Sequence, residues 1–111
     1  MESRLKAGIW VKAHLRRCAV EGIQAVIVRH GDDTAGSVLI NLNRLDGGCM
    51  VLSPGNRGDG VRVWLRAGGA DVMPEAEADG YIARQVKRDP DLWVIEIEDR
   101  QGRHCLDDPV Q

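Results

Sequence analysis

DPDLWVIEIEDRQGR, residues 89–103, is the most strongly patterned run in the sequence and decides how the sheet is built. Asp89 precedes a proline, which pushes it out of helical geometry, so a helix should end there. From Leu92 to Ile97 apolar residues occupy both faces of an extended segment, a pattern typical of a strand in the middle of a sheet. The stretch therefore predicts a central strand preceded by a helix.

Helical signals flank this strand on the N-terminal side and recur at the start of the chain. Pro74 is a favoured first helical residue, and acidic residues precede basic ones along 75–88, as the helix dipole favours. Trp10, Val11 and Cys18 fall within one half of a helical wheel, which predicts an amphipathic helix over 9–22 that ends at Gly22.

Between these helices the sequence predicts four strands, within 23–33, 35–45, 49–53 and 61–67, joined as an antiparallel meander. A loop rich in Gly, Pro, Asn and Asp, residues 53–60, separates the third from the fourth. In the fourth strand, alternation places Val61, Val63 and Leu65 inward and Arg62, Trp64 and Arg66 outward.

The predicted order is helix, four strands, helix, strand, which indicates an α+β fold with a mainly antiparallel sheet and helices packed on it. With 111 residues the chain has the length of a single domain, residues 1–111, ending in a loose tail over 107–111. A formal net charge of −2 provides no global field that favours nucleic acid. No apolar run reaches membrane-spanning length, and three unpaired cysteines indicate reduced thiols, so we expect a cytoplasmic protein that does not bind membranes.

Glu96, Glu98 and Asp99 form an acidic end to the last strand. With His104 they are candidate ligands for Mg²⁺ in a metal-assisted hydrolase. No spacing places the further acid or lysine that such chemistry needs, however, and a charge run is usually a solvated face. The favoured interpretation is a polar turn in which Gly102 takes a positive φ, with no metal site.

The outward face of Arg62, Trp64 and Arg66 is the candidate interaction surface, since arginines beside an exposed indole bind phosphates and stack bases, or anchor a protein partner. Because few aromatic residues are available for the core, the favoured interpretation is nevertheless that a helix covers Trp64 while the arginine heads reach water. The sequence contains no paired metal ligands, no nucleophile motif and no phosphate loop followed by Gly-Lys-Ser/Thr, so it predicts no cofactor and no catalytic residue.

WVKAHLRR at 10–17, PEAEADGYIARQVKRDPDLWVIEIEDR at 74–100 and the GRHCLD that follows give the chain a resemblance to a small family of uncharacterised alphaproteobacterial proteins, classed as a domain of unknown function. The resemblance implies one small cytoplasmic domain of helix and sheet, and it carries no known activity. The leading hypothesis is a non-catalytic bacterial binding domain with a protein partner. Nucleic-acid binding, the hydrolase and a homodimer formed through open sheet edges are the alternatives.

Overall fold

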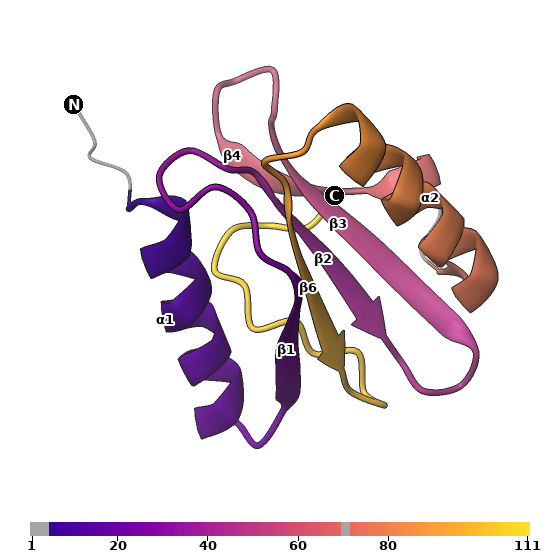
Figure 1. The fold of residues 1–111 in the computed structure, drawn as a ribbon. Coiled ribbons are helices and arrows are strands. Elements are labelled where there is room, and N and C mark those ends of the chain that lie inside the picture. The colour runs from indigo at the N-terminus through magenta and orange to yellow at the C-terminus, as the bar shows by residue number, and fades with distance from the viewer. Residues whose placement is uncertain (1–4, 70–71) are drawn as a thin grey trace.

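The computed structural model describes residues 5–69 and 72–111, and in these ranges one mixed sheet lies between two α-helices (Figure 1). The strand order is β1-β6-β2-β3-β4, and β5 pairs with β3. The α+β class and the mainly antiparallel sheet predicted from the sequence are confirmed. The elements are α1 Ala7–Val20, β1 Gln24–Arg29, β2 Val38–Asn43, β3 Gly48–Asn56, β4 Arg62–Arg66, the 3-10 helix η1 Ala67–Gly69, β5 Met73–Pro74, α2 Glu75–Arg88 and β6 Trp93–Glu98.

The last strand, β6, lies inside the sheet, as its apolar faces predicted. It pairs with β1 in the antiparallel sense and with β2 in the parallel sense. The predicted meander is therefore wrong at its first step, because β6 separates β1 from β2. A strand whose two faces are both apolar is buried best when its backbone groups pair with a neighbour on each side, and the loop 30–37 carries the chain past it.

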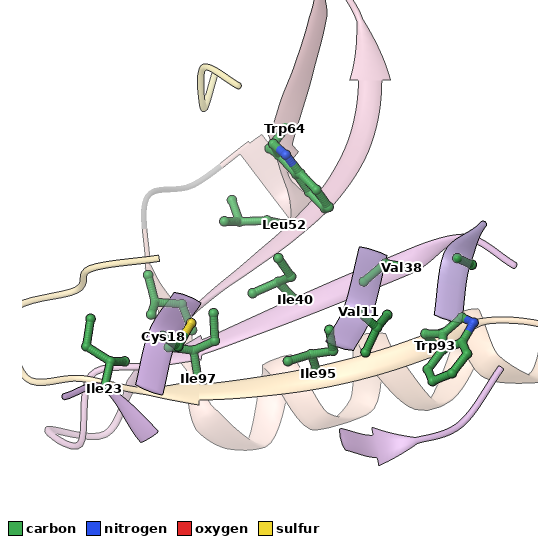
Figure 2. Close-up of a cluster of buried hydrophobic side chains, with 12 residues drawn as sticks. Val11, Cys18, Ile23, Val38, Ile40, Leu52, Trp64, Trp93, Ile95 and Ile97 are labelled. Atoms are coloured by element: carbon green, nitrogen blue, oxygen red, sulfur yellow. The ribbon is translucent and has the colours of Figure 1, made fainter. Parts of the chain in front are cut away.

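The side chains of β6 alternate between two hydrophobic clusters, one on each face of the sheet. Trp93, Ile95 and Ile97 join the cluster under α1, and Val94 joins the cluster under α2. Figure 2 shows Val11 and the other labelled α1 side chain, Cys18, directed into the first cluster. The two helices consequently cover opposite faces of one sheet.

The helix ends follow their predicted signals. Gly22, at φ +74°, lies just after α1, and Asp89 leaves helical geometry before Pro90. The first amides of α1, at Ala7 and Gly8, lack a capping side chain and donate instead to the carbonyls of Thr34 and Asp33, at 3.3 and 2.9 Å. Neither described helix combines the length and apolar character needed to cross a membrane.

The C-terminal residues predicted to form a loose tail over 107–111 are instead held against β4. Trp64 N donates to Pro109 O at 2.8 Å, and Gln111 N donates to Trp64 O at 2.8 Å. These bonds give a parallel bridge between Trp64 and Val110. The backbone N–H and C=O groups on the outer side of an edge strand need hydrogen-bond partners, which a nearby extended segment can provide. Because β4 is distant in sequence from residues 107–111, the composition of those residues does not reveal this pairing.

Candidate binding groove

A hollow of about 730 Å³ lies along α1, on the side that faces β4 and the C-terminal segment. We call it the α1 groove. A smaller hollow of about 230 Å³, lined in part by Tyr81 and Gln85, lies beside α2. The α1 groove is lined by Leu5, Lys6, Ala7, Trp10, Ala13, His14 and Arg17 of the α1 region, by residues 34–38, and by Pro54, Arg62, Trp64, Leu106, Asp107 and Asp108.

Three rings form the inner wall of the α1 groove. Trp10 and His14, one helical turn apart, stack with centroids 4.9 Å apart and planes at 6°. Trp64 of β4 approaches Trp10 at 5.7 Å with a tilt of 33°. Because the rings pack on one another, they form a fixed wall with little free aromatic face.

The outward placement of Trp64, on which the candidate interaction surface depends, does not hold, because only 7% of the residue is exposed and it belongs to the core under α1 (Figure 2). Leu65, predicted to face inward, is 41% exposed. Arg62 is exposed and borders the α1 groove, whereas Arg66 is half-buried outside it. The favoured interpretation of the sequence, an indole covered by a helix, describes the structure.

His14 is buried in the groove wall and joins α1 to the C-terminal segment. Its Nε2 lies 3.0 Å from the backbone oxygen of His104, and since a carbonyl only accepts, Nε2 carries the hydrogen. Burial lowers the pKa of His14 from its ordinary value of 6.5, and the hydrogen bond to His104 opposes this shift. His14 is therefore held neutral at a pH where an unfolded histidine takes up a proton.

This histidine gives an expected pH dependence. Below about pH 6.5 the unfolded chain binds a proton at residue 14 and the folded chain resists it, so the free energy of unfolding should decrease as the pH falls from about 7 to 5.5. Denaturant unfolding across this range should show a shallower decrease in His14→Gln. An unchanged slope in that variant would mean that His14 titrates alike in both states.

The rim of the α1 groove carries both signs of charge. Arg17 donates to Asp107 at 2.6 Å in an exposed pair that links α1 to the C-terminal segment, and such pairs contribute little stability. Lys6 and Arg62 have side chains without a hydrogen-bond or ion-pair partner among the described residues. Within the described part of the chain, two cations of the groove lining are thus available to a ligand.

The acidic candidates from the sequence are not brought together. Glu96 and Glu98 share the face of β6 toward α2, whereas Asp99 pairs with Arg103 through bonds of 2.9 Å, and hydrogen bonding lowers the pKa of Asp99 to about 2. His104 accepts the Leu106 N–H at 3.0 Å through Nδ1. Gly102 has φ +72°, as the polar-turn interpretation requires. Across 5–69 and 72–111 no cluster of three or more His, Cys, Asp or Glu is placed to hold a metal ion.

Sequence reasoning missed a polar layer next to Glu96. Asn41 and Asn43 of β2 are polar, yet they are only 4% and 7% exposed. Asn43 hydrogen-bonds to Glu96, whose pKa is raised by burial despite this bond and further raised by Glu98. The sequence does predict a second helix, α2, and a helix packed on the polar face of β2 buries that face.

The thiols of Cys18 and Cys49 are unsuited to nucleophilic chemistry. Burial raises the pKa of Cys18 to about 12 and the pKa of Cys49 to about 11, so both stay protonated at neutral pH. Both behave as small core residues.

Comparisons of the sequence and of the structure with known proteins point to the same family. A family model described as "Protein of unknown function (DUF1491)" matches residues 5–107. A crystal structure of a DUF1491 family protein from Caulobacter crescentus CB15 is 41% identical, with 97% of this chain and 100% of that chain covered and a TM-score of 0.87. An NMR structure of a DUF1491 family protein from the same organism is 40% identical, covering 99% of both chains with a TM-score of 0.84. A solution structure of an A. tumefaciens protein is 26% identical over 86% of both chains, with a TM-score of 0.71. No curated protein matches the chain.

Proposed function

The chain belongs to the DUF1491 family of proteins of unknown function, and from that premise we propose that it is a non-catalytic binding domain whose α1 groove holds an acidic segment of a partner protein. The observation that carries the proposal is a pair of cations, Lys6 and Arg62, that line a groove of about 730 Å³ and have no side-chain partner among residues 5–69 and 72–111. An acidic partner segment supplies carboxylates that pair with these cations, and Arg62 is able to bind one through two N–H groups.

The apolar residues that line the groove can contact an apolar side chain of the partner next to its carboxylate. Leu5 is 60% exposed, and Trp10 and Leu106 are partly buried hydrophobic residues at the edge of the core. An apolar anchor flanked by charge is the usual composition of a protein interface, in which Trp and Arg contribute most. An acidic residue next to a large apolar one is therefore the sequence feature we expect in the partner.

A nucleic-acid partner fits this groove less well. The indole of Trp64 is buried against Trp10 and offers no face on which a base can stack. A single-stranded nucleic acid needs a continuous basic track for its backbone, and Asp107 and Asp108 interrupt the lining of this groove, whereas a single carboxylate needs only one or two cations. With a formal net charge of −2, the whole molecule adds no attraction at long range.

A peptide selection tests this proposal directly. A random peptide library selected on the full chain should enrich sequences in which Asp or Glu adjoins Leu or an aromatic residue. For a selected peptide, Arg62→Glu should weaken binding about ten-fold or more, as loss of an interface arginine costs roughly 1 to 2 kcal/mol. Fluorescence anisotropy of labelled peptide gives the affinities.

Lys87→Glu is the matched control, because it reverses an exposed cation on α2, across the sheet from the α1 groove. The control should bind the selected peptide like the parent. Enrichment of basic or charge-free peptides, or equal weakening by both variants, would overturn the proposal. A single-stranded oligonucleotide probe that binds with a steep loss of affinity on adding salt would favour the nucleic-acid alternative instead.

A further inference from the structure

β1 is an edge strand whose outer side pairs with no described segment. Val26, Ile27 and Val28 of this strand are 46%, 40% and 59% exposed. Edge strands of monomeric proteins usually carry a lysine, a proline or an inward charge that discourages pairing with another chain, and residues 25–28 carry none. Residues 25–28 therefore present an apolar edge, bounded by Gln24 and by Arg29, before which the ladder becomes irregular.

Hydrogen bonds on β6 establish which backbone groups of that strand point toward β1. Trp93 N donates to Ser37 O at 2.8 Å, and Asp99 N donates to Asn43 O at 3.0 Å, so both amides point toward β2. The direction alternates along a strand, so odd-numbered residues of β6 point toward β2 and even-numbered residues toward β1.

The same alternation identifies the free groups of β1. Even-numbered Glu96 faces Val26 across the pair, so Val26 exchanges its backbone bonds with β6. Its neighbours Ala25 and Ile27 consequently direct their N–H and C=O groups away from the sheet. The ladder becomes irregular between Ile27 and Arg29, which ends the regular edge at Ile27.

The opposite edge of the sheet is already occupied. Along β4, Pro109 and Gln111 bond to Trp64, and Gln111 O accepts the Arg66 N–H at 3.0 Å. A molecule with one available edge pairs with a second copy and stops, whereas two available edges would allow an open fibre. The arrangement is thus suited to a closed assembly of two chains.

We propose that the chain forms a twofold homodimer in which β1 pairs antiparallel with β1 of a second copy, centred on Val26. In this register Ala25 of each copy faces Ile27 of the other, so all the outward groups of both residues are paired. Val26 then lies opposite Val26 of the second copy at a position without hydrogen bonds, where side chains come closest. A shift by one residue would direct inward-bonded groups at outward ones, so such registers are excluded. Among the registers that remain, the one centred on Val26 pairs Ala25 and Ile27 of both copies with each other.

The dimer is independent of the binding proposal above. No β1 residue lines the α1 groove, so pairing through β1 leaves the groove open. A monomeric parent would contradict the dimer without affecting the peptide-binding proposal, and a failed peptide selection would leave the dimer untouched.

Charge exchange at Val26 tests the dimer and its register together. The parent chain should sediment as a dimer that dissociates on dilution. Val26→Lys and Val26→Glu should each sediment as monomers, because like charges face one another, and an equimolar mixture should recover the dimer. Val20→Lys, at a helix residue that is 79% exposed, should dimerise like the parent. A parent that is monomeric at every concentration, or Val26 variants that remain dimeric, would overturn the proposal.

Amide hydrogen exchange provides a test that needs no variant. The amides of Ala25 and Ile27 should exchange slowly in concentrated protein and faster on dilution, whereas the Val26 amide, bonded to β6, should be insensitive to concentration. Equal exchange of the Ala25 and Ile27 amides at all concentrations would contradict pairing through this edge.

Discussion

Replacing Trp64 with alanine should lower the free energy of unfolding by about 3 to 5 kcal/mol, the range for truncating a buried tryptophan. Only 7% of Trp64 is exposed, and it packs with Leu52 in the cluster under α1 (Figure 2). Its removal leaves a cavity beneath Trp10, whose ring lies 5.7 Å away. Urea denaturation followed by circular dichroism measures the loss without relying on tryptophan fluorescence.

Leu65→Ala is the matched control on the next residue of the same strand. Leu65 is 41% exposed, so its truncation should cost about 1 kcal/mol. Losses of similar size in the two variants would mean that the indole is not part of the core. In that case the outward face of Arg62, Trp64 and Arg66 would again be the better candidate surface.

The contrast between Trp64 and β6 shows what the sequence determines. β6 was predicted to be central because Trp93 to Ile97 place apolar side chains on both faces. Both faces of such a strand must be covered, whichever elements cover them. In β4, by contrast, both Val63 and Trp64 are buried although they point to opposite faces. Alternation separates two faces of a strand, but which face is covered depends on α1 and the C-terminal segment, which come from far away in the chain.

The candidate site was harder to predict than the fold for the same reason. Helix ends at Gly22 and Asp89 depend on residues within one turn, and both were predicted correctly. The α1 groove depends on contacts such as His14 with His104 and Arg17 with Asp107, each joining residues 90 positions apart. Of the three residues predicted for the interaction surface, Arg62 and Trp64 line the groove, and Trp64 does so as part of its wall.

A methyl group at Gly31 should be among the most damaging small changes in the chain. A Cβ there would lie 2.5 Å from Trp93 Cδ1 and 2.7 Å from Trp93 N, and it would also press on the carbonyl of Asp91. The loop cannot easily move away, because Asp32 N donates to Asp91 O at 3.0 Å and the Trp93 indole donates to Asp32 O at 2.7 Å. We expect Gly31→Ala to lower the free energy of unfolding by about 3 kcal/mol, at the upper end of the usual range for overpacking.

Gly58→Ala separates this crowding from the general effect of replacing glycine. An added Cβ at Gly58 has nothing within 4 Å, so the substitution mainly restricts the unfolded chain and should change stability by less than about 1 kcal/mol, in the stabilising direction. Thermal and urea unfolding of both variants provides the comparison. Gly31 holds the loop 30–37 against the start of β6, and that loop carries the chain past β6 to β2. A harmless Gly31→Ala would therefore contradict the close approach of the loop to Trp93 on which the separation of β1 from β2 depends.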